Sequence, residues 1–250
     1  MRPLVLAALA AGLMFGPAAR AAAQEDPRAV IARAVQAYGG ADRLARLRCL
    51  RVTTRGTVRL AGAEAPFAAE TTVQLPGRMR NVLHADLKGQ AHTVTQVLDG
   101  ARVAVFVDDR AQPVKDVVAA ELRELLYAEQ VHTLAPLLRD PAYQLTPAGE
   151  DPVAGRPAVA VRVVSAGHKD VVLSFDRATG LLVKAERRTL DPETLREVAQ
   201  EEYYSDYRDS DGLPRPRKVV VYKDGKKFMD GEVVTIQYLD KVDESTFAPP

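Results

Sequence analysis

The sequence is dominated by stretches in which apolar and more polar residues alternate. In the first clear run, the less polar positions are Phe67, Ala69, Thr71, Val73 and Leu75. The next run repeats the pattern at Met79, Leu83, Ala85 and Leu87. Successive side chains of a strand point to opposite faces, so this period of two predicts strands that bury one face. Pro76 and Gly77 supply a turn between these two strands.

Further strands follow at short intervals. Residues 90–98 and 102–108 flank a turn at Asp99 and Gly100. Alternation returns after Tyr143 in three runs, which are Val159, Val161 and Val163, then Val171, Leu173 and Phe175, then Leu181, Val183 and Ala185. The last third of the chain carries a strand through Tyr203, Tyr204 and Tyr207, followed by strands at 218–222 and 231–238. Short turns between consecutive strands predict an antiparallel meander.

Helical spacing is confined to three places. Asp26 and Pro27 are typical helix-start residues and predict a helix that reaches Tyr38. A short helical piece follows at 41–47, and the longest helix is predicted at 113–134, with Pro113 in its first turn. Its apolar stripe consists of Val114, Val118, Leu122, Leu125 and Leu126. With many strands and few helices, the predicted fold class is α+β and mainly β.

Residues 1–23 have the pattern of a cleavable signal peptide. Arg2 precedes an apolar stretch at 4–15, and small residues lead to a cleavage site between Ala23 and Gln24. The apolar stretch is shorter than the roughly 20 residues that cross a bilayer. We therefore expect residues 24–250 to form a single soluble, monomeric domain in the periplasm.

Charge and motif content argue against several classes of function. Removing residues 1–23, which include Arg2 and Arg20, changes the formal net charge from +1 to −1, so a nucleic-acid partner is not expected. Cys49 is the single cysteine, and the histidines are scattered at His84, His92, His132 and His168. The sequence contains no His or Cys spacing typical of a metal site. It also lacks the Gly-x-Ser-x-Gly motif of serine nucleophiles and a glycine-rich phosphate-binding loop. We predict no catalytic residue, no metal and no cofactor.

Three polar or aromatic groups are interpreted as ordinary surface features. Adjacent strand residues point to opposite faces, so Glu201 and Glu202 are interpreted as a solvated edge and not as paired acids. The tyrosines of the last third are interpreted as half-buried strand residues with hydrated hydroxyls. They are Tyr203, Tyr204, Tyr207, Tyr222 and Tyr238. Lys223, Lys226 and Lys227 are interpreted as a solvated hairpin tip.

The order of these segments resembles the LolA-like superfamily of periplasmic lipoprotein carriers and outer-membrane lipoprotein-sorting proteins. The matching segments are Leu98–Gly100 before Val103–Phe106, Ala135–Leu138, Gly155–Pro157, Phe175–Leu181, and the tail from Asp211 to Phe247. Together they cover most of residues 24–250. The resemblance implies a curved, antiparallel, half-open β-barrel with helices packed in or over its concave face. It also implies that the hollow takes up acyl chains.

The balance of layers supports a hollow independently of the resemblance. One long helix and a short N-terminal pair are the only elements that can cover the apolar face of the sheet, so part of that face is free for a ligand. The predicted apolar lining is Phe67, Val73, Met79, Leu83, Val105 and Val161 on the sheet, with Val118, Leu122, Leu125 and Leu126 on the helix. The leading hypothesis is a carrier that binds lipoproteins or other acylated, lipid-like ligands and performs no chemistry, with a possible transient membrane-protein partner.

Two other classes of function stay open at this point. An envelope sensor or interaction module would use the same sheet to bind a membrane-associated regulatory protein without carrying lipid. A hydrolase is the third class, and it lacks a recognisable nucleophile, base and orienting group in the sequence.

Overall fold

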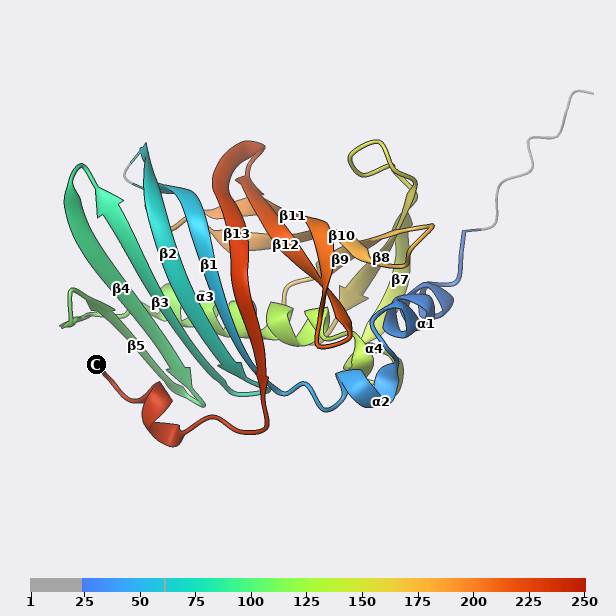
Figure 1. Ribbon diagram of the computed structural model, residues 1–250, viewed down its shortest axis with the longest axis horizontal. Coiled ribbons are helices and arrows are strands. Elements are labelled where there is room, and N and C mark those ends of the chain that lie inside the picture. The colour runs from blue at the N-terminus through green and yellow to red at the C-terminus, as the bar shows by residue number, and fades with distance from the viewer. Residues whose placement is uncertain (1–23, 61) are drawn as a thin grey trace, which may run out of the picture.

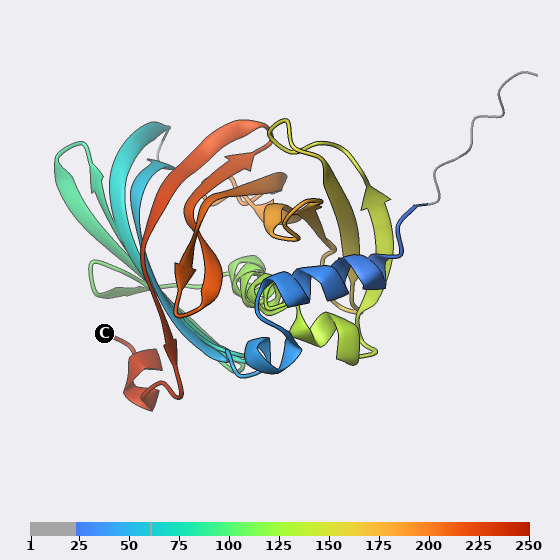
Figure 2. The same cartoon turned by 45° about the vertical axis from the view of Figure 1, so that its right-hand side comes forward.

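The computed structural model describes residues 24–60 and 62–250, and its strands form one 13-stranded antiparallel sheet (Figure 1). The predicted signal peptide, residues 1–23, lies outside the described residues. The order of strands across the sheet is β6-β5-β4-β3-β2-β1-β13-β12-β11-β10-β9-β8-β7. The sheet is strongly curved but not closed, because β6 and β7 are its two free edges (Figure 2).

The bounds of the strands agree with the alternation of the sequence. The strands are β1 (Cys49–Leu60), β2 (Ala63–Gln74), β3 (Arg78–Leu87), β4 (Gln90–Asp99), β5 (Arg102–Val107), β6 (Arg110–Gln112), β7 (Gln144–Gly149), β8 (Ala158–Val164), β9 (Val171–Asp176), β10 (Leu182–Leu190), β11 (Glu197–Ser210), β12 (Leu213–Lys223) and β13 (Lys226–Leu239). The helices are α1 (Pro27–Ala37), α2 (Ala41–Leu44), α3 (Asp116–His132) and α4 (Ala135–Arg139), with a 3₁₀ turn η1 at Glu244–Phe247. The predicted α+β class is confirmed.

The chain forms two meanders that meet along one seam. Strands β1 to β6 pair in sequence order, and so do β7 to β13. The seam is the antiparallel pairing of β1 with β13, from Cys49 opposite Leu239 to Val58 opposite Met229. The meander was predicted from the turns, but this long-range pairing was not.

Two local predictions are wrong. Pro113 does not lie in the first turn of α3, because the helix begins at Asp116 after Lys115. The predicted end of this helix, near residue 134, agrees with its last residue, His132, and a separate helix, α4, follows with a proline in its first turn. In β10, Leu182 is buried in place of the predicted Leu181 and Val183, because a bulge between Leu182 and Lys184 shifts the pairing with β9.

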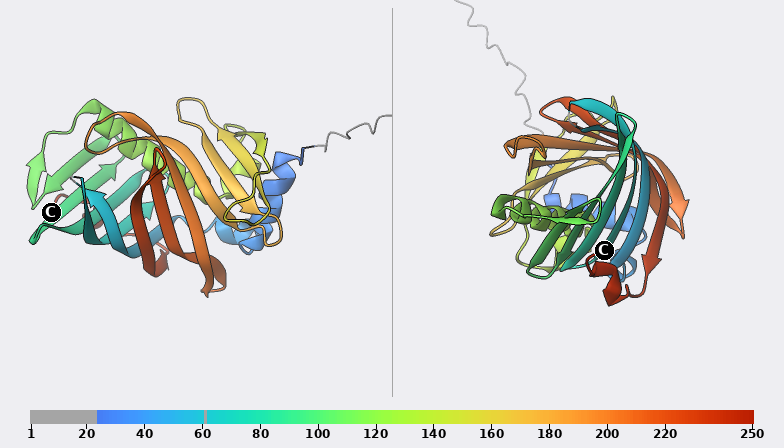
Figure 3. Two further views of the ribbon diagram at one scale, coloured as in Figure 1. Left: turned by 90° about the horizontal axis from the view of Figure 1, so that it is seen from above. Right: turned by 90° about the vertical axis from the view of Figure 1, so that its left-hand side faces the viewer.

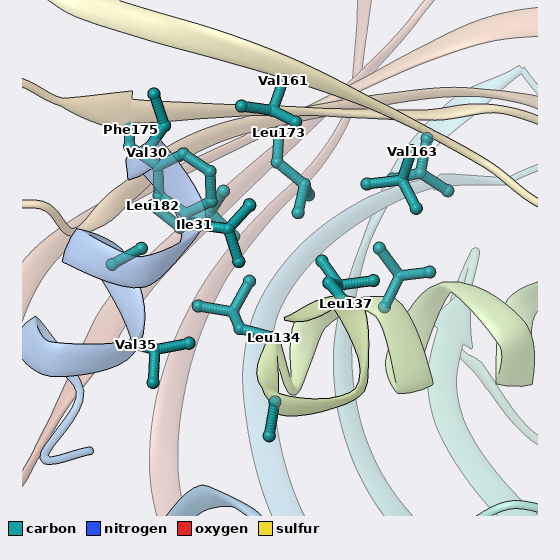
Figure 4. Packing of buried hydrophobic residues seen from close by; sticks show 14 of the residues in the cluster. Val30, Ile31, Val35, Leu134, Leu137, Val161, Val163, Leu173, Phe175 and Leu182 are labelled. Atoms are coloured by element: carbon teal, nitrogen blue, oxygen red, sulfur yellow. The ribbon is translucent and has the colours of Figure 1, made fainter. Parts of the chain in front are cut away.

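One end of the curved sheet is closed by a packed apolar core, here called the closed-end core (Figure 4). α1 contributes Ile31 and α4 contributes Leu137, while β8 and β9 contribute Val161, Leu173 and Phe175, all with no exposed surface. Burying side chains of this size stabilises the fold by about 1.5–3 kcal/mol each. α1 lies across this end of the barrel (Figure 2).

The C-terminal segment packs on the opposite face of the sheet from α3. Phe247 of η1 is buried in a small cluster with Cys49, Val97 and Val242. Val97 and Cys49 point away from the concave side because their strand neighbours Leu98 and Leu50 point towards it. Within residues 24–60 and 62–250, none of the helices has the length and apolar character needed to cross a membrane.

Candidate ligand-binding hollow

Helix α3 lies along the concave side of the sheet (Figure 3). Leu122 and Leu126 of α3 pack against Val73 of β2, Met79 of β3 and Leu98 of β4. This contact fixes one side of the helix to the first meander. The other side of α3 faces the strands of the second meander.

Polar contacts hold the first half of α3 to the second meander. Glu121 Oε1 accepts hydrogen bonds from Arg187 Nη1 (2.9 Å) and Thr189 Oγ1 (2.5 Å), and Glu121 Oε2 lies 3.3 Å from Lys169 Nζ. Burial acts to raise the pKa of Glu121, but the hydrogen bonds from Thr189 and Arg187 outweigh it and lower the pKa. The Glu124 carboxylate also accepts hydrogen bonds from His168 Nδ1 (3.0 Å) and from the Lys169 amide (2.9 Å). The helix is therefore positioned by charge as well as by apolar packing.

The inward stripe of α3 changes character along the helix. Val118, Leu122 and Leu125 line a cavity beside the first half, whereas Glu129 and His132 line cavities beside the second half. These five positions are spaced by three or four residues, so they form one stripe on one face. The stripe is therefore apolar in the first half of α3 and titratable in the second half.

The front cavity, beside the first half of α3, has a volume of about 460 Å³. Its wall is mostly apolar, with Leu190 from the end of β10, Pro192 and Leu195 from the β10–β11 connection, Val221 from β12, and Phe228 and Met229 from β13. Its polar side chains are Asn81, Gln96, Glu121, Arg187, Thr189, Gln200 and Lys223. The volume lies within the roughly 300–1,000 Å³ that is usual for small-molecule sites.

The rear cavity, beside the second half of α3, has a volume of about 290 Å³. It adjoins the front cavity, because Met229 lines both. A smaller pocket of about 110 Å³ shares seven of its lining residues, which are Tyr38, Leu50, Val73, Glu129, His132, Arg215 and Tyr238. The three cavities therefore lie side by side along α3.

The pKa values of two carboxyl groups in the rear cavity are shifted in opposite directions. Burial raises the pKa of Glu129, and the charge of Glu202 adds to this effect. Burial also acts on Glu202, but the charges of His132 and Arg187 and the hydrogen bonds from Tyr204 and Gln200 outweigh it, so the pKa of Glu202 is lowered. Tyr204 Oη donates to Glu202 at 2.5 Å and Gln200 Nε2 donates at 2.6 Å. Glu202 is the preferred anion and Glu129 the preferred neutral acid.

A tyrosine group closes the rear cavity against the closed-end core. Tyr38 Oη and Tyr207 Oη lie 2.9 Å apart, Tyr207 Oη donates to the Leu182 carbonyl at 2.5 Å, and the Leu182 amide donates to Tyr38 Oη at 3.3 Å. The guanidinium carbon of Arg215 lies 5.6 Å from the ring centroid of Tyr38 and 5.0 Å from that of Tyr238. This placement is within the range of cation–π attraction.

The structure brings together most of the predicted lining but not all of it. Val118, Leu122 and Leu125 line the front cavity, Val73 lines the rear cavity, and Met79, Val105 and Leu126 belong to the packed cluster between α3 and the sheet. Phe67 and Leu83 lie further along the concave side with Val58 and Ala85. Val161 is placed differently, because it is fully buried in the closed-end core, where its role is packing. That these residues bind a ligand stays a prediction.

The sequence interpretation missed the polar part of the hollow. Glu202 is not on a solvated edge, because it lies inside the barrel, whereas Glu201 pairs with Lys184 at 2.5 Å. The hydroxyls of Tyr204 and Tyr207 bind protein groups and not solvent. Lys223 is not part of a solvated tip, since its Nζ donates to the Leu190 carbonyl at 3.3 Å and burial lowers its pKa.

The inward direction of Glu202 could have been predicted from its position in the strand. Gln200, Glu202 and Tyr204 occupy alternate positions of β11 and all face the hollow. His132 was likewise about two helical turns beyond the apolar stripe of α3, on the same face as Leu125. In the part of the chain that the structure describes, no group of three or more His, Cys, Asp or Glu side chains is placed to hold a metal ion.

The comparison with solved structures identifies the fold. No protein-family model matches the sequence, and no curated protein matches it. A DUF1329 family protein from Desulfovibrio piger superposes with a TM-score of 0.54 at 14% identity, covering 90% of this chain and 98% of that one. A LolA superfamily protein from Nitrosomonas europaea gives a TM-score of 0.54 at 10% identity, with coverage of 90% and 98%.

A lower-scoring solved structure is a putative outer-membrane lipoprotein-sorting protein domain from Vibrio parahaemolyticus. Its TM-score is 0.49 at 9% identity, and the alignment covers 88% of this chain and 95% of that one. The protein described here has a LolA-like fold, so the resemblance predicted from the sequence is confirmed at the level of the fold.

Proposed function

We propose that this protein binds an apolar ligand that contains an acyl chain, and carries it within the cell envelope without chemical change. The observation that carries the proposal is the front cavity of about 460 Å³ between α3 and the sheet. Its floor and walls are supplied by apolar side chains from α3, the β10–β11 connection and β13. The likeness of the fold to a LolA superfamily protein supports the same class of function.

Burial alone supplies enough free energy for such a ligand. Each methylene group removed from water contributes roughly 0.8 kcal/mol. The stripe from Val118 to His132 runs fourteen residues along α3, which corresponds to roughly 21 Å of helix. An extended alkyl chain can therefore contact the helix along much of the hollow. Lipoproteins or other acylated molecules are the proposed ligands, and the periplasm is the proposed location.

The proposal is tested by filling the front cavity. Leu125→Trp places a larger apolar side chain at a half-buried position that lines this cavity. We expect the substitution to weaken binding of a fluorescent medium-chain fatty acid at least tenfold, measured by fluorescence titration of protein lacking residues 1–23. Val117→Trp is the matched control, because Val117 is on the same helix and 42% exposed. The control should bind like the unmodified protein.

Two results would count against the carrier proposal. One is the absence of fatty-acid binding at micromolar ligand by the unmodified protein. The other is a native preparation from which mass spectrometry recovers no lipid but which contains one stoichiometric protein partner. The second result would favour an interaction module, in which the hollow serves only to shape the sheet.

A further inference from the structure

Arg215 is a cation inside the hollow without a matching anion. It lies near the start of β12 and lines both the rear cavity and the smaller pocket. Its Nε is buried and has no hydrogen-bond partner. Among the described residues, no carboxylate oxygen lies within 4.0 Å of its guanidinium group. The faces of Tyr38 and Tyr238 offset part of the cost of burying this charge, but they supply no counter-charge.

Arg187 shows what a compensated arginine looks like in the same hollow. Its Nη1 lies 2.9 Å from Glu121 Oε1 and its Nε lies 3.9 Å from Glu202 Oε1. Both carboxylates are thus held near one guanidinium group. Arg215 has no such arrangement, although it also faces the interior of the barrel.

The neighbouring acids do not neutralise Arg215. Glu202 is committed to Tyr204, Gln200 and Arg187. Glu129 lines the same cavities as Arg215, but burial raises its pKa and favours the neutral acid. Arg215 therefore has no carboxylate partner of its own in the rear part of the hollow.

His132 supplies a second group that is free to bind. Its Nε2 is buried and has no hydrogen-bond partner, and its ring lines the same two cavities as Arg215. The ring of Tyr204 contacts it edge-on, with centroids 6.1 Å apart. A histidine nitrogen donates to an anionic oxygen when it carries a proton. Arg215 Nε and His132 Nε2 are thus two buried nitrogens without hydrogen-bond partners, on residues that line the same two cavities.

We propose that Arg215, assisted by His132, binds the anionic head group of a single-chain amphiphile, a carboxylate or a phosphate, whose alkyl chain lies along α3 towards the front cavity. This inference rests on the proposed function and adds the chemical class and the orientation of the ligand. The cavities adjoin at Met229, so the head and the chain can be bound together. Planar guanidinium groups suit both kinds of oxygen anion.

The test compares a carboxylate with its neutral ester on the same chain. The probes are dansyl-labelled undecanoic acid and the methyl ester of that acid, titrated against protein lacking residues 1–23. We expect the acid to bind at least about tenfold more tightly, because a charge-assisted hydrogen bond is lost in the ester. Arg215→Gln should reduce the affinity for the acid to that for the ester and leave the affinity for the ester unchanged.

Control variants separate the site from general charge and from misfolding. Arg55→Gln removes an exposed guanidinium group that pairs with Glu232 on the surface, and it should preserve the preference for the acid. Arg215→Lys should retain part of the preference, since it keeps the charge but not the planar geometry. If Arg215→Gln does not fold, the acid-to-ester ratio of the unmodified protein still decides the question.

The outcomes distinguish the two levels of the proposal. Equal affinity for acid and ester would overturn the anionic site while leaving the apolar carrier intact. Binding of neither probe would overturn the carrier itself. Inorganic phosphate and acetate are titrated alone as a further arm. If either binds through Arg215 as tightly as the dansyl acid does, the anionic site stands but the amphiphile is overturned in favour of a free anion.

Discussion

The closed-end core and the hollow are built on the same sheet but are filled in different ways. In the closed-end core, Ile31, Leu137 and Phe175 have no exposed surface and belong to one hydrophobic cluster. In the hollow, half-buried side chains such as Leu125 and Glu129 face cavities, and buried donors lack partners. The difference shows that one end is close-packed, whereas the other leaves space that the proposed ligand would fill.

The largest expected effect is a difference in the free energy of unfolding between a variant of the closed-end core and a variant of the hollow. Phe175→Ala leaves a cavity in the closed-end core and should lower the free energy of unfolding by about 3–5 kcal/mol. Leu125→Ala should cost less than about 2 kcal/mol, because Leu125 already borders empty space. Denaturant unfolding measures both values. Similar losses for the two variants would remove the contrast between core and hollow.

The next effect concerns the charged attachment of α3. Glu121→Gln should destabilise the protein by about 2 kcal/mol at pH 7, because Arg187 then lacks its closest carboxylate. The pKa of Glu121 is lowered by folding, so its contribution is present above its ordinary value of 4.5 and is lost as the pH falls through the lowered pKa. Thermal unfolding should show the difference between variant and parent shrinking in acid. A difference that does not change with pH would contradict this account.

The smallest expected effect is a gain in stability, produced by a substitution of Glu129. The pKa of Glu129 is raised by burial, so folding favours the protonated form and stability falls as the pH rises from the unfolded to the folded pKa. Glu129→Gln mimics the neutral acid and should raise the melting temperature by a few degrees at pH 8. The gain should disappear near pH 4, where the parent protein is also protonated. A loss of stability at pH 8 would mean that the Glu129 carboxylate is stabilised in the folded state.

Much of the fold follows from local sequence signals. The alternation in β2 and β3 and the Asp26 cap of α1 are read within a few residues, and the structure agrees with them. The pairing of β1 with β13 joins residues that are far apart in the chain, so no local pattern encodes it. The bulge in β10 could not be predicted from the local sequence either, because it depends on the pairing with β9.

The polar half of the hollow illustrates a different limit. Val118, Leu122 and Leu125 were found because apolar residues on a helix predict a buried stripe. Glu129 and His132 continue the same stripe, but charged residues at such positions are usually solvated. Their burial depends on β11 and β12 passing over them, which only the complete fold determines.

The seam between β1 and β13 has a consequence for how the protein is made. Because the first strand finds its second neighbour only in the last strand of the sheet, a nascent chain that stops before residue 226 leaves one flank of β1 without a partner. Unpaired strand flanks invite association with other chains. Nearly the whole polypeptide must therefore be present before β1 gains its second neighbour and the two meanders join.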